Sequence, residues 1–469
     1  MLRPSGFIAA ACGMLLFGVA GAEGQELQPS APKYQLNRAD EDYLYLQDKA
    51  KTTDFWEPVK YLRLNDRGTW YLSLGGEARE RYEYFNNNNW GSGPQDAGGY
   101  FLQRYFLHGD LHLGEGVRFF GQLQSSLEDG RRGGPRPTDR DEFDLHQAFL
   151  DLKLATAGSG SITLRSGRQE LAYGSQRLVS VREGPNVRQS FDGFRAMYRA
   201  DQVKLDAFAT KPVQTKRQVF DDGPDQSQAL WGAYSVVPLP LLSQASVDLY
   251  YFGLLRRQAR FDQGPARELR HSVGTRIWRE KKPLDYNFEF VYQWGSYGDG
   301  DIRAWTVASD TGYTSAALPC TPRFGLRADI ASGDDNPNNP DLQTFDPLFP
   351  KGAYFSENGL IGPANFINVN PSLALHFPHD LTVSANWDFF WRESIHDGIY
   401  NNAVVLVRSG RNSASRYIGS QPQATVEWNV DRHLTLVAIY AHFLAGDFLK
   451  ESGPGKDVDY LTTWLAYKF

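Results

Sequence analysis

Apolar and polar residues alternate with a period of two along many segments of the chain. In 285–295 and 381–392, aromatic and aliphatic residues occupy every second position and polar or charged residues fill the gaps. Alternate side chains of a β-strand point to opposite faces, so each such segment has one apolar and one polar face. Segments of about ten residues with this pattern are typical of tilted strands that cross a bilayer.

The pattern predicts an all-β protein, a closed antiparallel transmembrane β-barrel of about 18 strands, with sixteen as the alternative. The predicted strands are 70–84, 100–113, 117–128, 142–154, 161–173, 191–200, 203–211, 228–238, 245–256, 269–279, 284–296, 302–314, 322–332, 369–377, 381–394, 415–430, 433–445 and 458–469. Segments 228–238 and 433–445 are apolar on both faces, and Pro422 is awkward within a strand.

Long and short connections alternate along almost the whole predicted barrel. Residues 86–99 and 333–368 form long loops, 114–116 and 378–380 form short turns, and 297–301 is the main exception. Short periplasmic turns and long outside loops produce this alternation in outer-membrane barrels. No repeat of 40–50 residues, as in a β-propeller, is found.

Hydrocarbon cannot satisfy an open sheet edge, so the sheet must close, and 16–18 strands leave room for an aqueous channel. The last strand ends on Phe469 with one apolar face, which resembles the closing strand of bacterial outer-membrane barrels. That resemblance implies that Phe469 is read by the barrel-assembly machinery. The expected surroundings are outer-membrane lipid and lipopolysaccharide.

The amino terminus predicts export. Arg3, the apolar run 7–19 and the small residues 20–22 form a signal peptide over 1–22. Residues 23–69 are interpreted as a periplasmic leader or a plug, and 70–469 as the barrel. After cleavage Cys320 is the only cysteine, which excludes an intrachain disulfide and a cysteine-rich metal site.

The overall composition does not by itself indicate a membrane protein. Mean hydropathy is −0.48, 22% of residues are charged, and no later stretch has 18 uninterrupted apolar residues. In a barrel only every second residue meets lipid, so these values do not exclude the membrane. A net charge of −6 is too small to indicate a partner such as nucleic acid, and no cofactor is expected.

One segment, 161–173, changes the parity of its apolar residues between Leu164 and Leu171. An extra residue in the strand would produce this change, so a β-bulge is predicted near Ser166–Gly167. The bulge would turn Arg168 and Glu170 into the lumen together with Arg165.

Motifs for catalysis are weak. The chain has no Walker loop, no HExxH and no Gly-x-Ser-x-Gly, and the nine histidines are interpreted as wall residues. Residues 332–341 resemble a calcium loop, with Asp334, Asp335 and Asp341 as candidate ligands. They depart from EF-hand spacing, since Asn339 stands where the glycine and Phe345 where the glutamate would be.

Parity assigns many charged residues to the lumen face. The basic ones are Arg79, Arg81, Arg104, Arg118, Arg165, Arg168, Arg195, Arg199, Arg276, Arg327 and Arg392, and the acidic ones are Glu77, Asp110, Glu128, Asp206, Glu289, Asp329 and Asp388. They form either a salt-bridged wall or an arginine-lined path for anions. A carboxylate about 8 Å from one arginine gains only about 0.5 kcal/mol in water, so several arginines would favour anions and still release them.

Two stretches resemble the alginate-export outer-membrane family. They are Leu164-Arg-Ser-Gly-Arg-Gln-Glu-Leu-Ala-Tyr-Gly174, followed by Arg188-Gln-Ser-Phe-Asp-Gly193, and the region from Ala331-Ser-Gly-Asp334 to Gly362-Pro-Ala-Asn365. The resemblance covers most of 60–469 and implies an 18-stranded monomeric porin that passes a polyuronate outward. It implies Arg165, Arg168 and Glu170 as pore residues. The family's long periplasmic plug loop has no counterpart here, and residues 23–60 are the candidate substitute.

The sequence therefore predicts a passive, anion-preferring outer-membrane channel for an acidic polysaccharide such as alginate or for smaller anionic solutes. An outer-membrane enzyme and a structural or adhesive barrel without transport are the alternatives. An enzyme would need a Ser/His or Asp/His pair at the lumen mouth.

Overall fold

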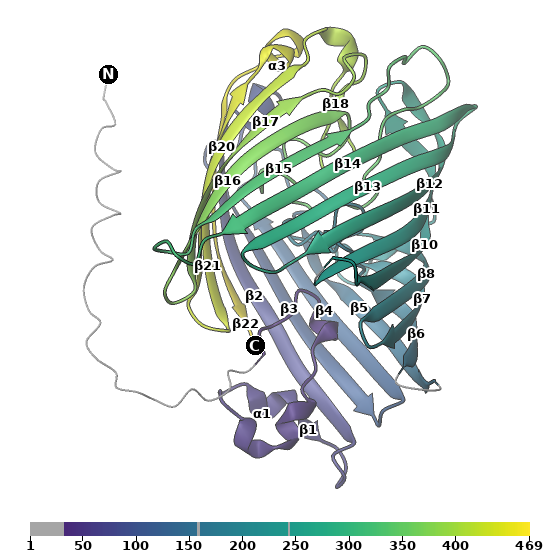
Figure 1. The fold of residues 1–469 in the computed structure, drawn as a ribbon, viewed down its shortest axis with the longest axis vertical. Coiled ribbons are helices and arrows are strands. Elements are labelled where there is room, and N and C mark those ends of the chain that lie inside the picture. The colour runs from purple at the N-terminus through teal and green to yellow at the C-terminus, as the bar shows by residue number, and fades with distance from the viewer. Residues whose placement is uncertain (1–31, 157–159, 243) are drawn as a thin grey trace. The chain divides into compact units, whose positions relative to one another are not determined.

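The computed structural model describes residues 32–156, 160–242 and 244–469. The predicted signal peptide, 1–22, lies outside the described residues. Residues 34–469 form one compact unit, built around a β-sheet whose strands run side by side in Figure 1. No helix in the described ranges is long and apolar enough to cross a membrane.

The sheet contains eighteen long antiparallel strands, and β22 pairs with β2 to close it. These strands are β2 (Trp70–Asn86), β3 (Tyr100–Leu113), β4 (Val117–Asp129), β5 (Asp141–Ala155), β6 (Ser161–Gln169), β7 (Phe191–Ala200), β8 (Val203–Gln214), β10 (Gln228–Leu239), β11 (Ala245–Phe261), β12 (Gly264–Arg279), β13 (Leu284–Tyr297), β14 (Gly300–Thr314), β15 (Arg323–Ala331), β16 (Phe366–Phe377), β17 (Leu381–Trp391), β20 (Tyr417–Asn429), β21 (Leu434–Ala445) and β22 (Val458–Lys468).

The remaining elements are short. They are η1 (Arg38–Asp40), η2 (Leu44–Gln47), η3 (Lys49–Lys51), α1 (Glu57–Lys60), β1 (Leu62–Arg63), α2 (Asn88–Gly91), β9 (Gly223–Pro224), β18 (Ile399–Tyr400), β19 (Leu406–Arg408), η4 (Gly410–Asn412) and α3 (Asp447–Ser452). The predicted barrel and its eighteen strands are confirmed. Strands β11 and β12 are longer than predicted and meet at the tight turn 262–263, a second exception to the alternation of loops.

Period-two alternation governs exposure, as β13 illustrates. Phe288, Phe290 and Trp294 are 38–47% exposed on one face, whereas Val291 and Gln293 on the other face are fully buried. The apolar row is available to lipid, and the polar row meets other protein groups inside the barrel. Burying polar side chains is tolerable there because they find hydrogen-bond partners.

The bulge predicted near Ser166–Gly167 is wrong. The pairing of β6 with β5 and with β7 continues through these residues without a register shift. Strand β6 ends at Gln169, so the change of parity marks the start of a loop. The adjacent strand pair β4–β5 does have register shifts, and His146 has no partner opposite it there.

Pro422 is accommodated by a local break in pairing. It remains opposite Trp387 of β17, but the β20–β21 ladder has no paired residues between Ser420 and Gln423. Proline lacks the N–H that such a ladder needs. The barrel therefore tolerates it at the cost of one interrupted ladder.

Residues 34–69 are folded against the barrel. Figure 1 shows α1 and β1 beside the beginning of β2. The Arg38 guanidinium donates to the carbonyl oxygens of Gly76 and Phe469 at 2.8 Å, and the ring centres of Trp56 and Phe469 lie 4.4 Å apart. The barrel's first and last strands are thus held together by the segment that precedes them.

Candidate channel interior

Two long loops occupy the inside of the barrel, 170–190 after β6 and 332–365 after β15. They pair with each other: the Phe349 N–H donates to the Leu178 carbonyl at 2.7 Å, and the Lys351 N–H to the Gln176 carbonyl at 3.0 Å. Backbone hydrogen bonds between loops so far apart in sequence produce a shared structure. We call this pair the inner loops.

The first inner loop is fastened to β2 and β3. Arg79 and Arg104 each donate to the Glu183 carbonyl at 3.1 Å. The Asn186 side chain is fully buried and donates to carbonyl oxygens in three separate segments, those of Gln103, Leu127 and Asp139. The Asn186 side-chain amide therefore anchors the first inner loop to β3, to β4 and to the loop that follows β4.

The same loop also reaches the far wall. Arg177 lies 3.0 Å from Glu289 of β13 and 3.9 Å from Asp329 of β15. In the closed ring of eighteen strands, β13 is nearly opposite β2. Loop 170–190 therefore crosses the interior and narrows it.

The second inner loop, 332–365, is fastened at two places along its length. Asp346 accepts from Arg256 of β11 at 2.5 Å, and the Asp346 carbonyl accepts from Gln293 of β13 at 2.7 Å. Farther along, Glu357 lies 2.9 Å from Arg81 of β2. Ion pairs from this loop thus reach both halves of the wall.

Most of the predicted pore arginines are neutralised. Arg81 pairs with Glu83 and Glu357, Arg104 with Glu77 and Glu183, Arg118 with Asp110 and Asp151, Arg165 with Asp151, Arg195 and Arg199 with Asp206, Arg276 with Asp248, and Arg327 with Asp388. Pairing of this kind makes a buried charge tolerable, whereas an unpaired buried charge is costly. These residues fit the salt-bridged wall.

Two of the arginines, Arg79 on β2 and Arg392, donate chiefly to backbone carbonyl groups. Arg79 holds the first inner loop, as described above. Arg392 lies just after the end of β17 and donates to the carbonyl oxygens of Ile395, Asp397, Ser413 and Ser415. Its predicted place on a lumen strand face is wrong, because the strand ends at Trp391. Arg392 instead clamps the loop 392–416.

Arg168 does not share the face of Arg165. Without a bulge, Arg168 lies on the same face of β6 as Leu164. It pairs with Asp192 at 2.9 Å, and Asp192 shares its face of β7 with Phe194, which is 68% exposed. Glu170 is buried and binds His146 at 2.8 Å and Arg188 at 2.8 Å. It fixes the point where the first inner loop begins.

Two cations of the inner loops lack such partners. Among the described residues, neither Arg182 nor Lys351 has a side-chain hydrogen bond or an ion pair, and each lies 5.5–5.6 Å from an aromatic ring centre, of Phe349 and Tyr354 respectively. Burial lowers the pKa of Arg182 to about 10 and that of Lys351 to about 8. Both are partly buried. Sequence reasoning missed them because loops carry no parity signal.

The predicted calcium ligands are not brought together. Asp334 is buried, Asp335 is exposed, and Asp341 accepts from the Asp301 N–H at 2.9 Å. A group of three possible metal ligands is found elsewhere in the described ranges. The carboxylate oxygens of Asp141, Asp144 and Asp222 lie within 4.8 Å of one another.

A closed barrel with apolar outer rows and loops folded into its interior defines an outer-membrane channel of the porin class. The Alginate export family model matches residues 70–462, and the chain belongs to this family. No curated protein sequence matches the chain.

Several solved porins from Pseudomonas aeruginosa share the fold. OccK11 (OpdR) is 13% identical with a TM-score of 0.53, covering 85% of this chain and 96% of that one. OpdK with vanillate is 12% identical with a TM-score of 0.55, covering 84% and 98%. OccK2 (OpdF) in complex with glucuronate is 12% identical with a TM-score of 0.54, covering 85% and 96%. At these identities the similarity concerns the fold.

Proposed function

We propose that this protein is a passive outer-membrane channel that prefers anionic solutes, and that carboxylated sugars, up to an acidic polysaccharide such as alginate, are its solute class. The observation that carries the proposal is the pair of unneutralised cations, Arg182 and Lys351, on loops that narrow the interior. The wall arginines balance their own carboxylates and leave little charge for a solute.

The family and the solved relatives support the same solute class. The family is described by alginate export, and two structurally similar porins were solved with vanillate and with glucuronate. These three substances are carboxylates. A guanidinium and an ammonium group in a narrowed interior are suited to bind a carboxylate weakly and to release it.

Single-channel recording in planar bilayers tests the proposal. Under a potassium chloride gradient, the wild type should reverse at a potential that favours chloride, and Arg182→Gln/Lys351→Gln should reduce this preference. Two charges at about 8 Å contribute roughly 1 kcal/mol in water, so the permeability ratio should fall about fivefold. Glucuronate should reduce the wild-type current more strongly than uncharged glucose at equal concentration.

Arg303→Gln is the matched control, because Arg303 is 66% exposed and pairs with Asp301. It should leave selectivity unchanged. Cation preference in the wild type, or equal selectivity in the double variant, would contradict the anion path. A folded protein without conductance would favour a barrel with an enzymatic or structural role.

A further inference from the structure

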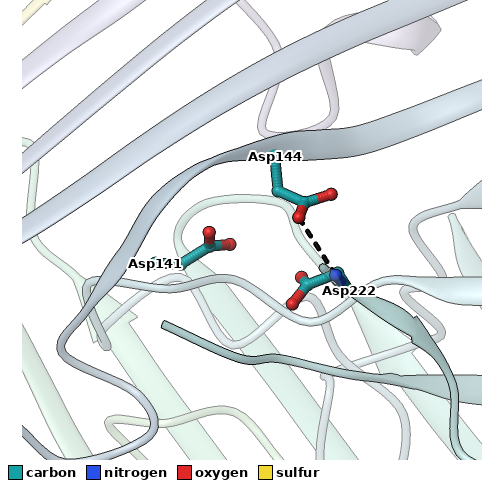
Figure 2. A group of neighbouring side chains, drawn as sticks. All are labelled: Asp141, Asp144 and Asp222. Atoms are coloured by element: carbon teal, nitrogen blue, oxygen red, sulfur yellow. Dashed lines mark hydrogen bonds between the residues drawn. The ribbon is translucent and has the colours of Figure 1, made fainter. Parts of the chain in front are cut away.

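Three carboxylates meet where β5 begins and the loop after β8 returns to it. The carboxylate oxygens of Asp141, Asp144 and Asp222 lie within 4.8 Å of one another. Figure 2 shows them pointing into a common space, Asp141 and Asp144 from β5 and Asp222 from the loop 215–227. In sequence, the strands β6, β7 and β8 lie between Asp144 and Asp222.

A register shift places two of these groups on one face. Asp141 and Asp144 are three residues apart and would face opposite sides of a regular strand. Against β4, however, Asp144 pairs with Gln124 and Asp141 with Ser126, so β5 has one residue more than β4 in this interval. Bulges of this kind redirect side chains. Both carboxyl groups are consequently buried, Asp141 completely.

Backbone contacts bring the third carboxylate. The N–H groups of Asp221 and Asp222 donate to Asp144 at 2.8 and 3.1 Å, and the Phe220 N–H donates to the Phe143 carbonyl at 2.9 Å. These contacts hold the loop across the start of β5. They also leave the Asp222 side chain only partly buried and reachable from solvent.

Two oxygen atoms at this site have no hydrogen-bond donor among the described residues. One is Oδ1 of the fully buried Asp141. The other is Oε1 of Gln124, a residue outside the acidic group that is 2% exposed and whose amide nitrogen donates to Asp141. A buried oxygen without a hydrogen-bond partner is unfavourable, and a bound cation would supply the missing partner.

The surrounding charges leave the site negative. Arg168 Nη1 lies 3.7 Å from Asp144 Oδ1, but Arg168 is also paired with Asp192, and the Lys216 ammonium donates to the Asp221 carbonyl at 2.6 Å. Asp221 adds a fourth carboxylate next to Asp222, and its Oδ1 is likewise without a donor among the described residues. Burial and the neighbouring carboxylate of Asp144 raise the pKa of Asp222 to about 6.

We propose that Asp141, Asp144 and Asp222, with the Gln124 carbonyl oxygen, bind a calcium ion that fastens the loop 215–227 to β5. Calcium takes oxygen ligands only, at about 2.4 Å, so oxygens in its shell lie no more than about 4.8 Å apart. The observed separations satisfy this limit. Magnesium requires a stricter octahedron at about 2.1 Å and suits this less regular set poorly.

Calcium titration of the purified full chain in detergent micelles, after chelation, tests the proposal. The wild type should bind one calcium ion per chain, and magnesium should bind at least tenfold more weakly. Asp141→Asn and Asp222→Asn should each weaken calcium binding at least tenfold. Asp335→Asn, an exposed residue of the predicted calcium loop 332–341, is the control and should bind as the wild type does. Heat-modifiable electrophoretic mobility shows that each variant is folded.

Trypsin provides a second readout. Lys216 and Arg217 are exposed within the fastened loop, so calcium should slow cleavage there several-fold in the wild type and in Asp335→Asn, but not in Asp141→Asn. Absence of saturable calcium binding would overturn the proposal. So would binding that survives in folded Asp141→Asn and Asp222→Asn, or that is lost in Asp335→Asn.

Discussion

Single charged residues inside this barrel differ chiefly in whether a countercharge is near. Arg104 lies between Glu77 and Glu183 with no exposed surface, whereas Arg182 has no ion pair among the described residues and lies over the Phe349 ring. Removing one member of a buried pair typically costs 3–5 kcal/mol because the partner stays buried and charged. Breaking such a pair would therefore destabilise the wall, and in the proposed function only the unpaired cations attract a solute.

Lys60 in α1 gives a prediction about pH. Its ammonium nitrogen is buried without a hydrogen-bond partner among the described residues, and burial lowers its pKa from 10.5 to about 7. Between pH 7 and 10.5, Lys60 is protonated when segment 34–61 is undocked and neutral when the segment is docked. Docking therefore releases a proton, so the docking of 34–61 should strengthen as pH rises from 7. Linkage allows up to about tenfold for each pH unit.

Trypsin cleavage after Lys49 and Lys51 measures this docking, since both side chains are exposed. The cleavage rate of the wild type relative to Lys60→Met should fall as pH rises from 7 to 9. Using the variant as reference removes the pH dependence of trypsin itself. A constant ratio would show that Lys60 does not titrate on docking.

At the scale of elements, the inner loops affect the width of the interior more than the strands do. Strands β2 to β22 form a regular wall, but the loops 170–190 and 332–365 determine how much of the interior is filled. The first of these loops is held by contacts to opposite walls. Loosening one set of contacts should therefore widen the passage without unfolding the barrel.

Asn186→Ala tests this expectation. The substitution removes hydrogen bonds to Gln103, Leu127 and Asp139 and leaves their carbonyl oxygens without this donor. Single-channel conductance should rise, or the current should fluctuate more between levels. Asn338→Ala, in an exposed part of the other loop, should behave like the wild type. Unchanged conductance in Asn186→Ala would mean that the loop stays in place without this anchor.

At the scale of the whole molecule, closure depends on the first and last strands and on the segment before them. Phe469 exchanges backbone hydrogen bonds with Gly76 at 2.9 and 3.0 Å, and Arg38 binds both of their carbonyl oxygens. Phe469 thus takes part in the seam, the junction between β2 and β22, as well as in the predicted assembly signal.

Substitutions at Phe469 separate these two roles. Phe469→Ala keeps the backbone seam but removes the aromatic ring, so the amount of folded protein in the outer membrane should fall several-fold if the ring is the assembly signal. Phe469→Trp retains an aromatic end and should restore that amount. Heat-modifiable mobility of membrane fractions gives the folded amount. Equal amounts for Phe469→Ala and the wild type would exclude a role of the ring in assembly.

The sequence by itself determined the wall. Period-two alternation is a local property, so the eighteen strands, the outward aromatic row of β13 and the two loop classes could be predicted without knowing any distant contact. The strand faces also assigned Arg104 and Arg165 to the inward side, and both side chains are buried in the structure. Where a strand ended earlier than expected, at Gln169 and Trp391, the parity argument failed with it.

Only the tertiary structure decided which charges are free, where the loops fold and which acids meet. The partners of Arg104 include Glu183 from a loop, and Asp222 reaches Asp141 across three intervening strands. Such pairings depend on chain closure over long sequence separations, for which local periodicity contains no information. For the same reason the sequence indicated a calcium loop at 332–341, while folding gathered carboxylates at a different place.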